Sequence, residues 1–282
     1  MSQKLVRYEI HEKIAVLTLS DPPANAYTHE MMLALDEAIL KARFDTEVEV
    51  IVVTGDGDKF FCAGADIQML QEVDPAFKYY FCLHANETLS RLEQTPKLTI
   101  AALNGHCVGG GLEIALACDL RWAKEHGGKC GLPEVHLGVL PGTGGTQRLL
   151  RLVGRSKALK LMISGDNMNF AAAKEAGLID DLIDCGVGSG DEGNGGTETQ
   201  GADHRAGFLD RVLERAQQFV SPQKASKAVG LIKRACVSGS EMAFEPSLAF
   251  ERELQQQLFQ SHDAKEGMLA FNEKRRPEFR GE

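Results

Sequence analysis

The stretch Leu98-Thr-Ile-Ala-Ala-Leu-Asn-Gly-His-Cys-Val-Gly-Gly-Gly-Leu-Glu113 decides the fold of this chain. Its first six residues form an apolar run of the kind found in strands that are buried on both faces. Three consecutive glycines, residues 109–111, follow closely, and a helical pattern then continues through Ala117. A buried strand that leads through glycines into a helix is a unit from which α/β folds are built.

The same alternation of strand-like and helix-like segments extends through the first two thirds of the chain. We predict strands at Leu5–Ile10, Ile14–Leu19, Val48–Val53, Leu98–Leu103 and Leu120–Ala123, with the first two forming a hairpin. We predict helices from Thr28 to about Arg43, from Pro75 to Glu93, from the glycine triplet to Ala117, from the loop 142–145 onward, and over Lys157–Ile163. This order predicts an α/β core.

The character of the sequence changes after residue 186. Residues 187–207 are mostly Gly, Ser, Asp, Glu, Thr and Asn without apolar periodicity, which predicts a flexible insert. Beyond it only helical patterns remain, over Phe208–Phe219, Gln223–Cys236, Glu241–Gln260 and Ala264–Lys274. We therefore predict three regions: an α/β core over residues 1–186, an insert over 187–207 and a helical region over 208–282.

The composition argues against several classes of protein. A formal net charge of −9 does not suit nucleic-acid binding, which usually needs a basic face. No run of about 18 apolar residues predicts a transmembrane helix, and the N-terminus lacks the apolar stretch of a secretory signal. The seven cysteines are odd in number and scattered through apolar segments, which is typical of reduced thiols in a cytoplasmic protein. No His/Cys cluster has metal-ligand spacing, so we expect no metal site.

Two glutamates stand beside glycine-rich segments. Glu113 follows the glycine triplet, and Glu134 follows Pro133 just before the loop Pro141-Gly-Thr-Gly-Gly-Thr-Gln-Arg148. Two carboxyl groups held close together can act as a general acid and a general base when one is protonated and the other is charged. Backbone N–H groups at the glycines can approach a developing oxyanion. The combination predicts an enzyme that adds or removes a proton next to a carbonyl group.

Each of these features also has a plainer explanation. The glycine triplet could serve tight packing of a helix against a strand, and a helix start can also bind phosphate. The Gly-Thr-Gly-Gly of residues 142–145 lacks the last glycine and the preceding strand of a dinucleotide fingerprint, and no Walker lysine follows it. No Gly-x-Ser-x-Gly elbow indicates a serine hydrolase. We expect four nearby residues to be packing groups and not catalysts, namely Cys62, His106, Cys107 and His136.

Five stretches together resemble the enoyl-CoA hydratase/isomerase (crotonase) superfamily in their order and spacing. They are Phe60–Ile67, Asn104–Glu113, Pro133-Glu134, Pro141–Arg148 and Phe271–Phe279. The resemblance covers nearly the whole chain apart from the insert. It implies a crotonase-like spiral of ββα repeats, followed by C-terminal helices that build homotrimers, usually stacked into homohexamers. It also implies an acyl-CoA thioester as the substrate, with no further cofactor.

The resemblance implies roles for individual residues. The backbone N–H groups of Ala65 and Gly110 would form an oxyanion hole around the thioester oxygen. Glu113 would hold and deprotonate the water that attacks C3, and Glu134 would deliver a proton to C2. The residues implied in CoA binding are Ala63, Ala65, Asp66, Ile67, Gln68 and Lys274. Gln68 departs from the lysine of some relatives, and the position of Lys274 can reach CoA phosphates, in some members from a neighbouring subunit.

The function expected from these features is the reversible hydration of 2-enoyl-CoA to 3-hydroxyacyl-CoA. A Δ3,Δ2-enoyl-CoA isomerase, or a hydratase for an unusual acyl group, is the alternative within the same superfamily. An RNA-binding or non-catalytic family member is an alternative of another class, and a subunit of a larger β-oxidation complex is a third. The acyl chain length and branching stay open at this point.

Overall fold

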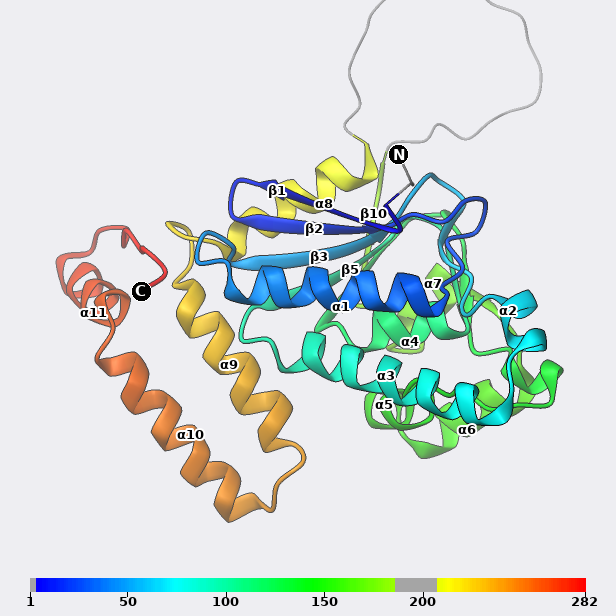
Figure 1. The fold of residues 1–282 in the computed structure, drawn as a ribbon. Helices are drawn as coiled ribbons and strands as arrows, with labels where there is room; N and C mark the ends of the chain where they lie inside the picture. The colour runs from blue at the N-terminus through cyan, green and yellow to red at the C-terminus, as the bar shows by residue number, and fades with distance from the viewer. Residues whose placement is uncertain (1–3, 186–206) are drawn as a thin grey trace, which may run out of the picture.

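The core of the molecule consists of two β-sheets with helices packed on them (Figure 1). In the computed structural model, which describes residues 4–185 and 207–282, the larger sheet has the strand order β1-β2-β3-β5-β7-β10. Its strands are Val6–His11, Ile14–Leu19, Val50–Gly55, Leu98–Leu103, Leu120–Lys124 and Asp181–Ile183. The smaller sheet has the order β4-β6-β8-β9, with strands Phe60–Cys62, His106–Val108, Lys129–Gly131 and Met168–Asn169.

Successive strands alternate between the two sheets. β3 in the larger sheet is followed by β4 in the smaller one, β5 is followed by β6, and β7 is followed by β8. The strands β2, β3, β5, β7 and β10 pair in parallel, whereas β1 and β2 form the predicted antiparallel hairpin. Each turn of the chain therefore adds one strand to each sheet before a helix follows. The predicted spiral of ββα repeats is confirmed.

Helices follow the strands in each turn of the spiral. They are α1 (His29–Phe44), α2 (Ile67–Glu72), α3 (Pro75–Gln94), α4 (Gly110–Leu116), α5 (Gly145–Val153), α6 (Arg155–Ser164), α7 (Phe170–Glu175) and the 3-10 helix η1 (Glu134–Leu137). As predicted, α1 begins after Thr28, whose side chain accepts a hydrogen bond from the Met31 N–H at 3.4 Å. No helix in the described part of the chain is both long and apolar enough to cross a membrane.

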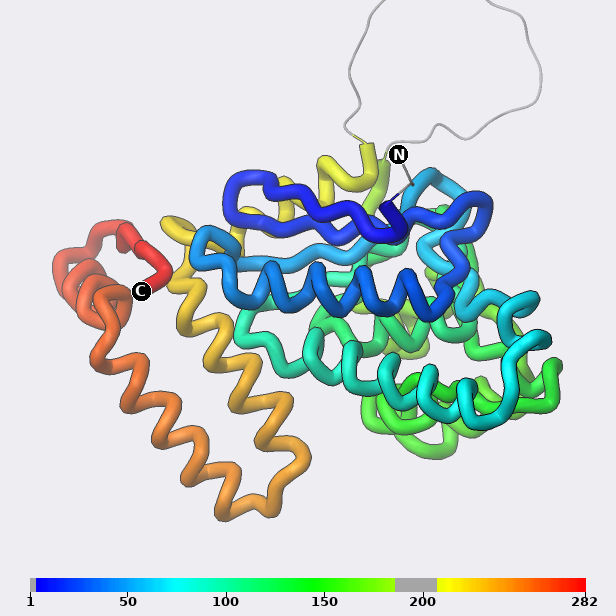
Figure 2. Tube along the Cα trace, in the orientation of Figure 1, coloured from blue at the N-terminus to red at the C-terminus, as the bar shows by residue number. Residues whose placement is uncertain are grey.

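The C-terminal region is helical, as predicted. It consists of α8 (Phe208–Ala216), the 3-10 helix η2 (Gln217–Phe219), α9 (Ser226–Gly239), α10 (Phe244–Phe259) and α11 (His262–Glu273). Lys233 ties α9 to the core, because its ammonium lies 2.9 Å from the Asp119 carboxylate. α10 and α11 extend beyond α9, away from the sheets (Figures 1 and 2). The insert predicted at 187–207 lies outside the described residues, except for Gly207 at the start of α8.

The central strands of the larger sheet are buried on both faces, which explains their continuous apolar sequence. In β3, Ile51 and Val53 belong to the hydrophobic core that includes residues of α1, α3 and α4. Val50 and Val52 point the other way, into a second core that includes residues of α8. The strand is therefore held by helices on both sides, as the sequence predicts.

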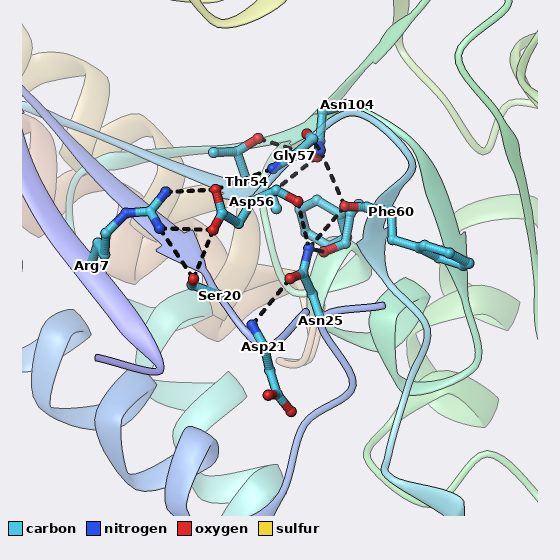
Figure 3. Close-up of polar contacts among 11 residues, drawn as sticks. Arg7, Ser20, Asp21, Asn25, Thr54, Asp56, Gly57, Phe60 and Asn104 are labelled. Carbon is cyan, nitrogen blue, oxygen red and sulfur yellow. Dashed lines mark hydrogen bonds and ion pairs between the residues drawn. The ribbon is translucent and has the colours of Figure 1, made fainter. Parts of the chain in front are cut away.

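A buried asparagine holds the loop between β3 and β4 (Figure 3). The Asn104 amide donates to the carbonyl oxygens of Gly57 at 2.7 Å and Phe60 at 3.1 Å. Its side-chain oxygen accepts from the Gly55 N–H at 3.0 Å and from the Thr54 hydroxyl at 3.3 Å. One side chain thus makes four hydrogen bonds that join the end of β3, the loop and the start of β4.

An ion pair supports the same loop from the N-terminal hairpin (Figure 3). Two guanidinium nitrogens of Arg7 each lie 2.8 Å from the Asp56 carboxylate, which also accepts from the Ser20 hydroxyl at 2.8 Å. The hydrogen bond from Arg7 holds the pKa of Asp56 well below its usual range. Asn25 donates to the carbonyl oxygens of Asp56 and Phe60, both at 3.0 Å. Because β4 begins at the end of this loop, these contacts place the segment that follows β4.

We expect Asn104→Ala to lower the free energy of unfolding by about 2 kcal/mol, because it removes these hydrogen bonds and leaves the buried Gly55 N–H without an acceptor. Urea unfolding followed by circular dichroism measures this change. Asp58→Ala is the control, because Asp58 lies in the same loop with its side chain 94% exposed, and we expect its unfolding midpoint to match the wild type. An unchanged midpoint for Asn104→Ala would show that the loop does not depend on the hydrogen bonds of Asn104.

Candidate active site

Glu113 lies in the first turn of α4 and is 2% exposed. One oxygen of its carboxylate, Oε1, accepts from the backbone N–H groups of Thr143 at 2.8 Å and Gly145 at 2.7 Å. The other oxygen, Oε2, accepts from the Thr143 hydroxyl. The loop before α5 therefore surrounds this carboxylate with donors, while Oε2 keeps capacity for a further donor such as a water molecule.

Glu134 begins η1, and its carboxyl group has a different environment. Its Oε2 is buried and has no hydrogen-bond partner among residues 4–185 and 207–282. Burial, together with the nearby charge of Glu113, raises the pKa of Glu134 to about 7, although its own backbone N–H and the charge of Lys78 act in the opposite direction. A carboxyl group with this pKa can donate or accept a proton near neutral pH.

The glycine loops bring the two glutamates to the start of α4. A β-carbon on Gly109 would lie 3.1 Å from Glu134 Oε1, and a β-carbon on Gly145 would lie 2.9 Å from Glu113 Oε1. Gly109 has φ 55° and ψ −133°, a conformation that residues with a side chain rarely adopt. Glycine at these positions therefore allows both carboxyl groups to approach the backbone closely. The structure brings together the two residues that the sequence predicts as acid and base.

The Ala65 N–H is free to bind a ligand. Tyr27 donates from its N–H to the Gly64 carbonyl at 2.9 Å and accepts from the Asp66 N–H at 3.0 Å, so Tyr27 and Ala65 form a parallel bridge. In such a bridge the N–H of Ala65 itself points away from Tyr27. Within the described part of the chain, no acceptor engages this N–H.

Gly110 carries the other backbone N–H that the resemblance implies as an oxyanion donor. It is the first residue of α4, so its N–H has no partner within the helix. A β-carbon on Gly64 would lie 3.0 Å from the Gly110 nitrogen, so the segment carrying Ala65 runs directly beside the start of α4. The two N–H groups thus come from adjacent backbone segments, next to both glutamates.

The residues predicted to bind CoA are only partly brought together. Ala63 and Ala65 lie next to the free N–H groups, and Asp66 caps α2 by accepting from the Met69 N–H at 2.6 Å. Ile67 and Gln68 follow on the exposed side of α2. Lys274 ends α11, and α11 lies at the opposite end of the molecule from α2 (Figures 1 and 2). A single chain therefore does not bring Lys274 to the other predicted residues.

His106, Cys62 and Cys107 have packing environments, as expected, whereas the side chain of His136 is exposed. His106 accepts from the Lys129 N–H at 3.1 Å through its Nδ1, and its ring centroid lies 5.3 Å from that of Phe60. Cys62 and Cys107 are fully buried. Burial raises the pKa of Cys62 to about 12, which keeps it a thiol at neutral pH. His136 lies on η1 against the backbone of Gly165.

Two residues of the site were not predicted, Thr143 and Tyr27. Thr143 supplies two of the three donors to Glu113, and Tyr27 pairs with Ala65 while its side chain reaches toward Thr143. Thr143 lies inside a glycine-rich motif, so the sequence already marked its position as part of a functional segment. Tyr27 precedes a helix in an ordinary sequence context and gave none.

Comparisons with known proteins agree on one family. The family model described as Enoyl-CoA hydratase/isomerase matches residues 9–184 and 201–282. The short-chain-enoyl-CoA hydratase of Clostridium acetobutylicum is 36% identical over 267 residues, which cover 94% of each chain. The probable enoyl-CoA hydratase of Bacillus subtilis is 35% identical over 274 residues, which cover 97% of each chain. The crystal structure of an enoyl-CoA hydratase from Geobacillus kaustophilus superposes with a TM-score of 0.89 at 41% identity, covering 100% of this chain and 98% of the other.

The raised pKa of Glu134 predicts a pH-dependent effect on stability. Its pKa is about 7 in the folded protein, against an ordinary value of 4.5. Between these values the folded state keeps a proton that the unfolded chain has lost, so stability falls as the pH rises from 4.5 to 7 and then levels off. Glu134→Gln removes this titration. We expect the Tm of the variant, relative to the wild type, to increase from about pH 5 to about pH 8 in calorimetry. A difference that is constant over this range would contradict the assignment.

Proposed function

The chain belongs to the enoyl-CoA hydratase/isomerase family, and from this premise we propose that it catalyses the reversible hydration of 2-enoyl-CoA thioesters to 3-hydroxyacyl-CoA. One observation carries the proposal. Two carboxyl groups in contrasting environments, Glu113 held by three donors and Glu134 with an unpartnered buried oxygen, flank the glycine start of α4. Hydration needs one group to take a proton from water and another to give a proton to carbon.

In the proposed reaction, the thioester oxygen accepts hydrogen bonds from the N–H groups of Ala65 and Gly110. Water attacks C3 while Glu113 takes its proton, and the C2–C3 π electrons move onto the thioester oxygen as an enolate. The enolate collapses as C2 takes the proton of Glu134. Before the next cycle the proton must pass from Glu113 to Glu134, either directly or by Glu113 releasing a proton to solvent while Glu134 takes one from it. Each backbone donor to such an oxyanion typically contributes about 3–4 kcal/mol of transition-state stabilisation.

The proposed reaction adds water across a double bond by proton transfers and formation of a C–O bond, with no net oxidation, and the residues named above supply each step, so it requires neither a metal nor a redox cofactor. The segment from Ala63 to Gln68 is proposed to bind the CoA moiety, because it starts at the oxyanion donors and continues along α2 to the surface. Lys274 is proposed to reach CoA phosphates from a neighbouring subunit, because α11 of the same chain points away from α2. We also place the protein in the cytoplasm, because its seven cysteines are all unpaired thiols.

We expect the protein to form a homotrimer or a homohexamer in solution. Several large apolar side chains on α10 and α11 are exposed in the single chain. They include Phe244 at 74% and Phe259 at 57% on α10, and Phe271 at 84% on α11. Exposed apolar groups of this size mark surfaces that another protein covers. Size-exclusion chromatography with light scattering measures the mass directly. A monomer of 30.7 kDa at micromolar concentration would contradict this expectation.

We expect Glu113→Gln and Glu134→Gln each to lower kcat for hydration of crotonyl-CoA by a factor of about 10²–10⁴, which is the usual contribution of a general acid or base. The ultraviolet absorbance of the conjugated enoyl thioester falls on hydration and measures the rate. Glu175→Gln is the matched control, because Glu175 is an exposed glutamate at the end of α7, and we expect it to retain wild-type activity. Wild-type activity in Glu134→Gln would exclude Glu134 as the proton donor.

Labelled water distinguishes hydration from isomerisation of the double bond. In H₂¹⁸O, hydration places the label on C3 of the product, whereas a Δ3,Δ2-isomerase moves a proton and adds no oxygen. We expect one labelled oxygen in the 3-hydroxyacyl product by mass spectrometry. A product without label from a 3-enoyl-CoA, together with no reaction of crotonyl-CoA, would assign the chain to the isomerases.

A further inference from the structure

Tyr27 lies just before α1 and is buried against the start of α4. It is 2% exposed, and its ring occupies the space that a side chain on Gly110 would need. The ring centroid lies 5.8 Å from that of Phe81 on α3, so the ring is held between α3 and α4. A buried tyrosine normally needs a partner for its hydroxyl group. The partner of this hydroxyl is a residue of the proposed active site.

The Tyr27 hydroxyl lies 3.5 Å from the Thr143 hydroxyl, which in turn contacts Glu113. A threonine hydroxyl has a single proton, and the carboxylate oxygen of Glu113 can only accept it. The direction of the chain follows from this: Tyr27 donates to Thr143, and Thr143 donates to Glu113 Oε2. Burial and the charge of Glu113 raise the pKa of Tyr27 well above its ordinary value, so the phenol stays protonated as this chain requires.

The backbone of the same residue fixes the other half of the site. The parallel bridge between Tyr27 and Ala65 consists of two hydrogen bonds, at 2.9 and 3.0 Å, and turns the Ala65 N–H away from Tyr27. The side chain of Tyr27 meanwhile packs under Gly110. One residue therefore contacts the groups that carry both proposed oxyanion donors and, through Thr143, the proposed base.

We propose that Tyr27 is a positioning residue for hydration, which holds Glu113 through Thr143 and aligns it with the N–H groups of Ala65 and Gly110. The proposal rests on the function proposed above. Tyr27 touches no reacting atom in this role. Its hydroxyl restrains the carboxylate that directs water toward C3, so its loss affects the orientation of the base and leaves the oxyanion donors in place.

The variant Tyr27→Phe tests the role of the hydroxyl alone, because it keeps the ring and the backbone bridge. We expect kcat for crotonyl-CoA to fall about three- to tenfold, as for the loss of one buried hydrogen bond. We expect KM to stay within about twofold and the Tm to stay close to that of the wild type, since substrate contacts and packing are retained. Tyr79→Phe is the matched control, because Tyr79 is 65% exposed on α3, and it should leave kcat unchanged.

A double-mutant cycle separates this chain of hydrogen bonds from a general packing effect. In a Thr143→Ala background, Tyr27→Phe should change kcat by less than about twofold, because the link to Glu113 is already broken. Thr143→Ser keeps the hydroxyl and should keep most of the activity that Thr143→Ala loses. The comparison of Thr143→Ser with Thr143→Ala measures the second hydrogen bond of the link, from Thr143 to Glu113, without changing Tyr27.

Three results would overturn the proposal. They are a wild-type kcat for Tyr27→Phe, an equal effect of Tyr27→Phe in the wild-type and Thr143→Ala backgrounds, and equal activity of Thr143→Ala and Thr143→Ser. Each of them leaves the proposed hydratase function intact, because the wild type is active in all three. A wild type that hydrates no enoyl-CoA would instead overturn the function, and the positioning role with it.

Discussion

The close approach of the start of α4 to the segment after β4 is the constraint on which the site depends. A β-carbon on Gly64 would crowd the Gly110 nitrogen, and one on Gly111 would overlap the carbonyl group of Cys62. Any side chain there would push the two segments apart and separate the N–H groups of Ala65 and Gly110. The short strand pairs β4–β6 and β6–β8 hold the segments in place on one side. On the other side, Asn25 and Asn104 hold the loop before β4 by donating hydrogen bonds to the Phe60 carbonyl.

The close packing of these segments also places Glu113 and Glu134, which have the same side chain, in opposite environments. Glu113 reaches the loop before α5 and is surrounded by donors. Glu134 lies against Gly109 with one buried oxygen unpartnered among the described residues, and burial raises its pKa. Pairs of carboxyl groups whose environments differ in this way divide the roles of acid and base between them. The division here follows from backbone N–H groups and burial, since no lysine or arginine hydrogen-bonds to either carboxyl group in the described residues.

Much of the fold was predictable because it follows from local patterns. The strand at Leu98–Leu103 has the predicted bounds, and α1 starts at the predicted cap, Thr28. The individual strands of the smaller sheet were not predicted from local patterns, because they have only two or three residues and such segments show no periodicity. The helix α2 was missed for the same reason, with six residues and no buried side chain. The hydrogen bonds by which Asn25 and Asn104 hold the loop before β4 were missed, because asparagine is common in loops and the partners of these two residues lie far away in the sequence.

By itself, the sequence determined the fold class, the two glutamates and the glycines beside them. These features depend on local requirements, such as a strand with two buried faces or a backbone turn that only glycine makes easily. Only the tertiary structure decided how Glu113 and Glu134 differ, and that Tyr27 joins Thr143, a residue 116 positions away. It also decided that α11, which ends at Lys274, lies at the opposite end of the molecule from α2. Hydrogen bonds, burial and pKa values depend on which distant segments pack together. The residues next to a side chain in the sequence do not determine that packing.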